Sequence, residues 1–528
     1  MPAVRHHYFS ILLIPLTRER QQLNQNTYEF LRNRFAHALY EPFLSVPNRA
    51  PLTYADIDRR SAAIAEVLRE DGVKPGDRVV CQVEKSPDAV ALYLACLRSG
   101  FIYVPLNTAY TAEEVGYFVG DAEPTAFVFS SSRAAKLHPL GDLSGVPCMY
   151  TLDDDGNGTL AEYASQVVGE DQIVSSGYQD VAALLYTSGT TGRSKGAMIT
   201  HENLISNGRT LHAIWRFREG DLLLHCLPIF HVHGLFVALH TAMANGSNVI
   251  FLPEFDVESV RHYMQSATVM MGVPTQYSRL LADPEFGAVD VRNIRLFTSG
   301  SAPLPESVFR EFRLRTGHSL CERYGMTECG IITSNPPEGQ RMVGTVGYAL
   351  PEVDVRVVDE DGNMVGANEV GVVETRGPNV FAGYWRKPEK TAESMRADGF
   401  FQTGDIGSMA VDGRVSLVGR SSDMIISGGY NVYPKEVELV LESIDGVVEA
   451  AVVGLPHPDF GEGVAAFMVA DNIVDEPTLR AACESRLAGF KRPKAYIFTP
   501  DLPRNAMGKV QKSVLRAEHS QAFALMDM

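Results

Sequence analysis

The sequence has few cysteines and no long apolar run, and each absence excludes a class of protein. The seven cysteines stand singly, without any Cys-x-x-Cys pair, so we expect reduced thiols, no zinc site and no disulfide framework. No segment approaches the roughly 20 apolar residues of a membrane-spanning helix, so no membrane span is expected. Internal repeats and low-complexity tracts are also missing, which excludes a repeat architecture.

Positive charge is scarce as well. The 47 lysines and arginines are outnumbered by 64 aspartates and glutamates, which gives a formal net charge of −17 at pH 7. This charge argues against nucleic acid or an anionic membrane as the main partner. A site for anionic substrates must therefore concentrate its cations locally. The length of 528 residues predicts more than one domain, and the composition is compatible with a monomer or a dimer.

Residues 1–24 are expected to form a disordered extension. The apolar run at 8–16 is too short to span a bilayer and is followed by no small-residue cleavage site. Residues 1–18 contain no acid but several basic or histidine residues, so a presequence is one alternative and a mis-assigned start is another. We expect a cytoplasmic location, with the mitochondrial matrix as the alternative if residues 1–24 are a presequence.

Helical and strand-like patterns alternate up to about residue 350, which is typical of an α/β protein. Ser86 and Pro87 favour a helix start, and the pattern ends near Gly100. The apolar run at 294–297 predicts one of several buried strands. Short strands and Asp-Gly turns follow, and beyond 419–423 the pattern predicts a compact α+β unit. We therefore divide the chain into an N-terminal domain, 25–419, and a C-terminal domain, 420–528.

The run from Thr187 to Gly196 predicts a phosphate-binding loop. It holds three glycines, five hydroxyl side chains and two cations, with no acid and no apolar residue. Glycines allow close approach of the backbone to an anion, and hydroxyls and cations bind its oxygens. A solvated turn is the alternative, but apolar strand-like runs flank the loop on both sides. The spacing is not that of a Walker loop, because Lys195 is followed by glycine rather than by Ser or Thr.

Four further runs are unusual, although each could singly be a turn, a cap or surface charge. They are Glu322–Glu328, Phe401–Asp405, Gly419–Glu436 and Leu502–Val510. Together with the loop, in this order and spacing, they resemble the adenylate-forming superfamily of acyl-CoA synthetases, luciferases and peptide-synthetase adenylation domains. The resemblance covers about residues 50–515. It implies an α/β fold, with a large N-terminal domain of αβαβα layers and a distorted β-barrel, and a small mobile α+β C-terminal domain.

The resemblance also implies a two-step reaction with ATP, Mg²⁺ and coenzyme A. A carboxylate attacks the α-phosphate of ATP and releases pyrophosphate, and the CoA thiol then displaces AMP. Both steps bring anions together, so orientation and fixed cations should supply most of the catalysis.

Nucleotide-binding roles follow from the matching positions. The β- and γ-phosphates would be held by Thr187, Ser188, Gly189, Thr190, Thr191, Gly192 and Lys195. The adenine would lie against Tyr324, beside Gly300, Ser301, Ala302, Gly325 and Met326. Thr327 would contact the α-phosphate, and Glu328 would bind Mg²⁺, a hard cation suited to carboxylate oxygens. Asp405 would accept from the ribose hydroxyls, with Arg420 nearby.

The C-terminal domain would serve both half-reactions by changing its orientation. Lys509 is the candidate catalytic cation, because its compact ammonium can bridge the carboxylate and the α-phosphate. Gly428 and Gly429 resemble the small residues that line the pantetheine tunnel. The hinge position, usually Asp or Lys in this family, is Ser422 here.

Several segments are most similar to those of malonyl-CoA synthetases, among them 227–236 and 272–281. A dicarboxylate keeps a second carboxylate after activation, and Arg279 is the candidate partner for it. His231 would be a gate or hydrogen-bond donor near the acid, and Ser301 is a further candidate residue for the acid. The alternative readings are that Arg279 lies on the exposed face of a short helix and that His231 and His233 are core histidines.

The expected function is therefore ATP-dependent activation of malonate, and of methylmalonate as a plausible second substrate, to an acyl-AMP and then to the CoA thioester. One alternative is a synthetase for a medium-chain or aryl monocarboxylic acid. Another is a non-catalytic homologue that retains nucleotide binding, although every motif residue needed for adenylation is present. A carrier-loading adenylation enzyme is the third, disfavoured because no carrier-like segment follows residue 515.

Overall fold

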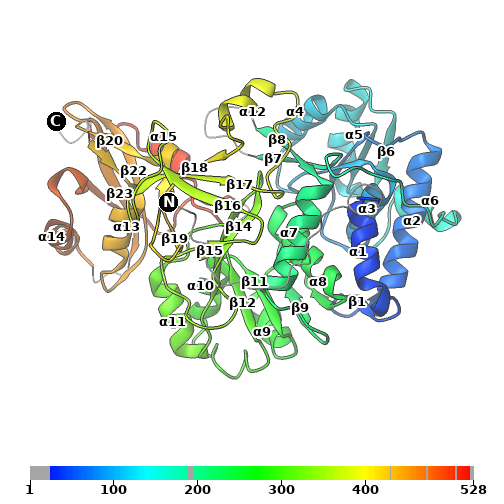
Figure 1. Ribbon diagram of the computed structural model, residues 1–528, viewed down its shortest axis with the longest axis horizontal. Helices are drawn as coiled ribbons and strands as arrows, with labels where there is room; N and C mark the ends of the chain where they lie inside the picture. The colour runs from blue at the N-terminus through cyan, green and yellow to red at the C-terminus, as the bar shows by residue number, and fades with distance from the viewer. Residues whose placement is uncertain (1–23, 188–193, 429, 471–473, 506–507, 524–528) are drawn as a thin grey trace.

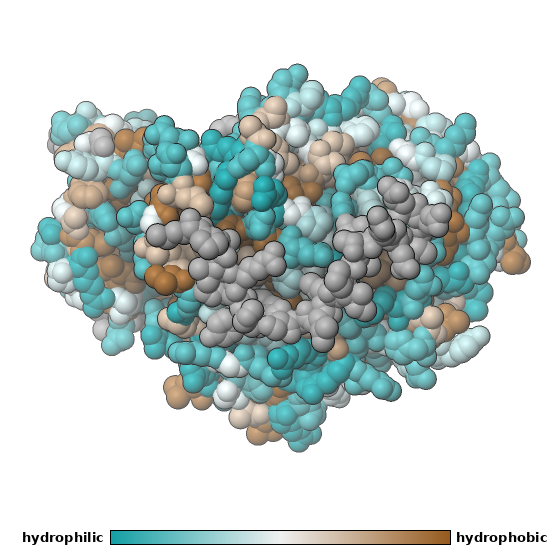
Figure 2. Space-filling view, in the orientation of Figure 1, coloured by the Kyte–Doolittle hydropathy of each residue, from teal (hydrophilic) through white to brown (hydrophobic). Residues whose placement is uncertain are grey.

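The computed structural model describes residues 24–187, 194–428, 430–470, 474–505 and 508–523 (Figure 1). Of the predicted extension at 1–24, all but Asn24 lies outside these ranges, as do Ser188, Gly189, Thr190, Thr191, Gly192 and Gly429. Among the described residues, no helix has the length and apolar character needed to cross a bilayer. Hydrophilic side chains cover most of the face seen in Figure 2, with hydrophobic ones scattered among them.

A nine-stranded sheet forms one layer of the N-terminal domain, in the order β15-β14-β13-β12-β11-β9-β10-β1-β2. The pairs from β13 through β12, β11, β9 and β10 to β1 are parallel. The strands are β1 (Pro42–Ser45), β2 (Leu52–Thr53), β9 (Leu222–His225), β10 (Asn248–Phe251), β11 (Val269–Gly272), β12 (Leu296–Ser299), β13 (Cys321–Met326), β14 (Gly330–Ser334) and β15 (Tyr348–Ala349).

A six-stranded sheet in the order β6-β5-β3-β4-β7-β8 forms the second layer. Its strands are β3 (Arg78–Gln82), β4 (Ile102–Pro105), β5 (Ala126–Phe129), β6 (Cys148–Thr151), β7 (Val181–Thr187) and β8 (Lys195–Thr200). The last two pair antiparallel, with Thr187 opposite Lys195, so the phosphate-loop segment joins two strands that lie side by side.

Most of the helices in this part of the chain pack on these sheets, and all but α12 contribute buried residues, with three separate clusters of buried hydrophobic residues between the layers. They are α1 (Thr27–Phe35), α2 (Tyr54–Glu70), α3 (Pro87–Ser99), α4 (Ala112–Ala122), α5 (Ala134–Leu143), α6 (Thr159–Gln166), α7 (His201–Ile214), α8 (His240–Asn245), α9 (Val257–Met264), α10 (Pro274–Ala282), α11 (Glu306–Thr316) and α12 (Pro388–Ser394). Short 3₁₀ turns lie at η2 (Ala36–Ala38) and η3 (Ser131–Arg133), and η4 (His233–Leu239) is a π-helix.

Local sequence signals explain several of these bounds. Ser86 caps α3 through the amide of Ala89, and Gly100 ends it in the left-handed conformation, as predicted. The strand predicted at 294–297 instead runs from Leu296 to Ser299. The amide of Ile294 bonds within a turn, to the carbonyl of Val291, and the pairing of β12 with β11 begins only at Leu296.

Two antiparallel sheets follow. The first holds β16 (Asp354–Val358), β17 (Val370–Arg376), β18 (Phe401–Met409) and β19 (Val415–Arg420), and η5 (Ser421–Asp423) comes directly after it. The second, mostly antiparallel, holds β20 (Ile425–Ser427), β21 (Tyr430–Val432), β22 (Val447–His457), β23 (Gly461–Ala470) and β24 (Ala495–Phe498). Around it lie α13 (Pro434–Glu442), α14 (Glu476–Arg486), η6 (Gly489–Lys491) and α15 (Lys512–Glu518).

The strands after residue 424 have their own cores on the two faces of their sheet, apart from the cores of the N-terminal sheets. Figure 1 shows them at one end of the molecule, opposite α2, α3 and α6. The predicted α/β class, with a large N-terminal and a small C-terminal domain, is confirmed. All seven cysteines are buried and free.

Candidate active site

Three predicted nucleotide residues meet where β13, β18 and β19 come together. The Tyr324 hydroxyl donates to Oδ2 of Asp405 at 2.6 Å, and Arg420 Nε lies 3.0 Å from Oδ1 of the same carboxylate. Asp405 and Arg420 are partners in the β18–β19 register, which explains why residues fifteen positions apart meet. Burial raises the pKa of the Tyr324 hydroxyl, so it stays a neutral donor. The arrangement offers a buried, oriented carboxylate to a pair of hydroxyls.

Glu328 lies in the turn after β13, where its side chain is buried. Its Oε1 accepts a 3.0 Å hydrogen bond from the Tyr384 hydroxyl, and the Lys195 ammonium stands 4.3 Å from the centre of the Tyr384 ring. Burial raises the pKa of Glu328, whereas the Tyr384 hydrogen bond and the charges of Arg420 and Lys195 act to lower it. The fold thus brings Lys195 and Glu328 together from distant segments.

The surroundings of Glu328 fit Mg²⁺ that arrives with ATP. Within the described ranges, no group of three His, Cys, Asp or Glu side chains could hold a metal by itself. Mg²⁺ suits this arrangement, because it is commonly bound by one or two carboxylates together with substrate phosphates and water. Glu328 would supply the carboxylate, and the phosphates and water would supply the other oxygens.

Lys509 enters the site from the C-terminal domain on a short turn. Gly508 has a φ of 73°, and a Cβ there would lie 2.6 Å from Thr275 Oγ1, so the turn packs against the start of α10. The backbone amide of Lys509 donates to Asn505 Oδ1 at 3.0 Å. Burial of its ammonium among neighbouring groups lowers the pKa of Lys509, as does the charge of Arg420, although part of the residue is exposed to solvent. The domains therefore stand in an orientation that places Lys509 toward Arg420.

The two histidines of the 227–236 segment lie beside Ser301. The Ser301 hydroxyl is 3.3 Å from Nδ1 of His233, and the His233 amide donates to Nδ1 of His231 at 3.3 Å. Burial and the charge of Arg323 lower the pKa of both rings, to about 4 for His231, so both are neutral near pH 7. Ser301 has a φ of 71°, a conformation rare for a residue with a side chain and typical of functional loops.

Arg323 belongs to this cluster, although no role was predicted for it. It is 4% exposed, and its Nε and Nη2 have no hydrogen-bond partner among the described residues. A Cβ on Gly300 would lie 2.5 Å from its Cζ, so glycine at that position makes room for the guanidinium. Burial lowers its pKa to about 10, which leaves it charged near neutral pH. The signal that could have found it is a charged residue directly before Tyr324, within the unusual run Glu322–Glu328.

The other predicted residues take varied positions. Arg279 is exposed on α10, four residues after Thr275 and so on the same helix face. At Gly325 a Cβ would lie 2.0 Å from the Gly330 carbonyl oxygen, which excludes a side chain. Ser422 is exposed within η5, and Gly428 turns the β20–β21 hairpin with a φ of 59°. Half-buried positions are occupied by Ala302, Met326 and Thr327.

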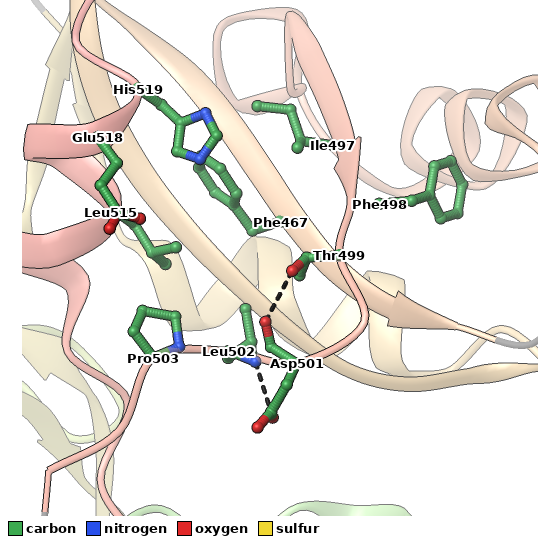
Figure 3. Close-up of a pocket in the computed structure, with 10 residues that line it drawn as sticks. All are labelled: Phe467, Ile497, Phe498, Thr499, Asp501, Leu502, Pro503, Leu515, Glu518 and His519. Atoms are coloured by element: carbon green, nitrogen blue, oxygen red, sulfur yellow. Dashed lines mark hydrogen bonds between the residues drawn. The ribbon is translucent and has the colours of Figure 1, made fainter.

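A separate groove lies away from these residues. A groove of about 400 Å³ opens in the C-terminal domain between β24 and α15, with Phe467, Leu502, Leu515 and His519 among its walls (Figure 3). None of the residues predicted to bind ATP, the acid or CoA lines it. The candidate active site is therefore the set of polar side chains where the turn that carries Lys509 packs against the N-terminal domain, and not this groove.

Comparison with known proteins agrees with this geometry. The AMP-binding enzyme family matches residues 34–385, and the AMP-binding enzyme C-terminal domain matches residues 436–509. A malonate–CoA ligase of Arabidopsis thaliana is 35% identical over 480 residues, which cover 84% of this chain and 78% of that protein. A feruloyl-CoA synthase of Amycolatopsis sp is 35% identical over 475 residues, covering 88% and 93%.

Among solved structures, ATP-bound MatB from Rhodopseudomonas palustris is 46% identical and superposes with a TM-score of 0.91, covering 95% of this chain and 100% of that one. These findings confirm the predicted superfamily and the predicted use of ATP, Mg²⁺ and CoA. The individual roles of the site residues remain predictions. The chain belongs to the AMP-binding enzyme family, and it is an acyl-CoA ligase.

Proposed function

We propose that the acid is malonate, with methylmalonate as a second substrate, so that the protein is a malonate–CoA ligase. The observation that supports this most is the Arg323 guanidinium, which is buried beside the neutral histidines and has no carboxylate partner in the part of the chain that the structure describes. A buried charge is costly unless it is paired, and the cost is repaid when a ligand of opposite charge binds.

A dicarboxylic acid presents two carboxylates, and the site has separate cations for them. Lys509 would meet the carboxylate that attacks ATP, because it stands toward Arg420 and Asp405. Arg323 would bind the second carboxylate through its free Nε and Nη2, in the forked geometry that suits a carboxylate. A monocarboxylic acid would leave Arg323 unpaired, which disfavours such substrates.

Neutral imidazoles complete the pocket. The lowered pKa of His231 and His233 avoids a further positive charge, and each ring can offer one N–H donor. Nε2 of His233 is buried without a partner among the described residues, so it is available to a substrate oxygen. Arg279 is exposed on α10, the helix whose first turn contacts the turn that carries Lys509. It would meet the acid as the acid enters the site.

Overall similarity alone does not select the acid. Relatives with about the same identity are named for malonate, for ferulate and for long-chain fatty acids. The selection must therefore reside in a few pocket residues. The alternative, a medium-chain or aryl acid, is an outcome of the following test.

The test is CoA-dependent release of AMP with malonate, methylmalonate, acetate, octanoate and benzoate. We expect kcat/KM for malonate to exceed that for octanoate and benzoate at least about 100-fold, because those acids leave a buried charge unpaired. Comparable rates with octanoate or benzoate would show that the dicarboxylate assignment is wrong. No turnover of any acid, with ATP binding intact, would support a non-catalytic homologue.

A further inference from the structure

Lys85 lies outside all the motifs, in the loop between β3 and α3. Its ammonium is enclosed by the ends of β9 and β10, strands of the other N-terminal sheet. Nζ is 2.9 Å from His225 Nδ1, 3.0 Å from the His225 carbonyl oxygen and 2.5 Å from the Leu252 carbonyl oxygen. It also stands 4.4 Å from the centre of the Phe251 ring. No carboxylate is among these contacts.

The contacts of Lys85 determine the tautomer of His225. An ammonium has three N–H donors and no acceptor, and here it faces three acceptors. Nδ1 of His225 must therefore carry a lone pair, which leaves the proton of the neutral ring on Nε2. Nε2 lies 2.9 Å from the Gly234 carbonyl oxygen and so donates to it. Burial and the charge of Lys85 both lower the pKa of His225, which agrees with a neutral ring.

Gly234 occupies a position that allows little adjustment. A Cβ there would lie 2.1 Å from the Pro228 carbonyl oxygen, so the backbone at Gly234 packs too closely on the backbone at Pro228 to leave room for a side chain. Gly234 directly follows His233 in the π-helix η4, and π-helices are rare outside functional sites. The backbone amide of His233 in turn contacts the ring of His231. The Gly234 carbonyl is therefore a point through which the orientation of both histidines can be set.

We propose that Lys85 is a positioning residue for acyl-adenylate formation: through His225 it holds the Gly234 carbonyl, and so the rings of His231 and His233, in the orientation that meets the acid. The proposal rests on the roles given above to these two histidines, but not on malonate as the acid. It links the six-stranded sheet, which carries the phosphate loop, to the pocket for the acid.

The charge of Lys85 matters because only the ammonium form has enough N–H donors for its three acceptors. Burial lowers its pKa to about 7, and the titratable groups that face it are His225 and the Cys226 thiol, whose pKa burial raises to about 11. A neutral amine has only two N–H donors for the three acceptors. Either one acceptor loses its donor, or the ring proton moves to Nδ1 and the Gly234 carbonyl loses its donor. Both results loosen the histidine segment as the pH rises through about 7.

The first experiment compares wild type with Lys85→Met, which keeps the length of the side chain but has no donor. Lys74→Met, at an exposed lysine in the loop before β3, is the matched control. Acid-dependent ATP–pyrophosphate exchange is measured from pH 6 to 9 with the best acid of the panel. We expect Lys85→Met to lower kcat about tenfold or more, with KM for ATP unchanged, and to remove a descending limb near pH 7 seen in wild type and in the control.

Retention of the wild-type pH profile in Lys85→Met, or a wild type without that limb, would overturn the proposal. A second pair guards against a variant that fails to fold. His225→Gln keeps an acceptor for Lys85 and a donor for Gly234, whereas His225→Leu keeps neither. We expect most of the exchange activity in the Gln variant and a loss of tenfold or more in the Leu variant, and equal loss in both would contradict the proposal. If the acid is not malonate, the same exchange experiments are run with the acid that the panel identifies, so the two proposals fail independently.

Discussion

The Tyr384 hydroxyl donates a 3.0 Å hydrogen bond to Oε1 of Glu328, and the same aromatic ring lies under the ammonium of Lys195. One side chain from the segment before α12 thus contacts both the candidate Mg²⁺ ligand and a candidate phosphate ligand. The bond favours the ionised form of a carboxylate whose burial favours the neutral form.

Replacement of Tyr384 by Phe should weaken the binding of Mg²⁺–ATP. Without the hydroxyl, the pKa of Glu328 rises further, so a larger fraction of this carboxyl group is neutral at a given pH and the loss should grow as the pH falls. Hydrogen bonds to charged groups contribute roughly 1.5–3 kcal/mol, which predicts about a tenfold or greater rise in the Mg²⁺ concentration for half-maximal exchange. Mg²⁺ titrations at pH 6.5 and 8.0 measure it. An equal effect at both values would mean that Tyr384 acts by packing alone.

Lys509→Met should separate the two half-reactions. Exchange of pyrophosphate into ATP should fall at least about 100-fold, because no other cation would bridge the attacking carboxylate and the α-phosphate. Thioester formation from preformed acyl-AMP should stay within a few-fold of wild type. Lys390→Met, at an exposed position of α12 paired with Glu393, is the control. Equal loss of both steps would contradict the role given to Lys509.

Arg323→Met and Arg279→Met should differ in their effects on malonate. Loss of one member of a buried charge pair commonly costs 2–5 kcal/mol, so we expect kcat/KM for malonate to fall roughly 100-fold or more in Arg323→Met. Arg279 is exposed, and its replacement should cost less, about fivefold at most. Octanoate activity, measured in parallel, should change little in either variant. A larger effect at Arg279 would mean that Arg279, and not Arg323, binds the second carboxylate.

The same Arg323→Met change should stabilise the unliganded protein. Arg323 is charged and unpaired in the apo fold, and its folded pKa of about 10 lies below the ordinary value because the fold disfavours its charge. Replacement of such a group by an apolar side chain is often neutral or stabilising by about 1–4 kcal/mol. Thermal unfolding with and without malonate provides the measurement. Malonate should raise the midpoint of wild type more than that of the variant.

Acid should destabilise the fold through its buried histidines. Burial lowers the pKa of His201 from 6.5 to about 4, so between these values the unfolded chain binds a proton that the folded chain does not. Stability is therefore present above about pH 6.5 and is lost as the pH falls toward 4, by about 2 kcal/mol at pH 5 from this residue alone. Urea unfolding of wild type and His201→Gln at pH 7.5 and 5.0 checks the slope, which should be smaller in the variant.

Much of the fold could be predicted from the sequence because its signals are local. Ser86 and Gly100 bound α3 through bonds within a few residues of each end, and the flanks of the loop at 187–195 pair as adjacent strands. The strand at 296–299 was displaced from its predicted place by two residues, because its start depends on pairing with β11 and not on its own apolar run.

The site residues divide in the same way. Asp405, Glu328 and Lys509 stand in motifs whose order along the chain is recognisable, and the structure brings the first two together with Arg420. Tyr384 and Lys85 lie outside every motif recognised in the sequence. Their importance depends on partners 56 and 140 positions away, which no local pattern reveals.

The sequence by itself determined the family, and it predicted a glycine-and-hydroxyl loop for phosphates. Through the family resemblance it also predicted a carboxylate for the ribose and a lysine for the reacting oxygens. The tertiary structure decided which charges have partners. Arg323 is conspicuous only once the packing shows that no described residue bonds to its Nε or Nη2, because desolvation and unmet hydrogen bonds are properties of all surrounding segments together. The proposed choice of a dicarboxylic acid depends on that long-range arrangement.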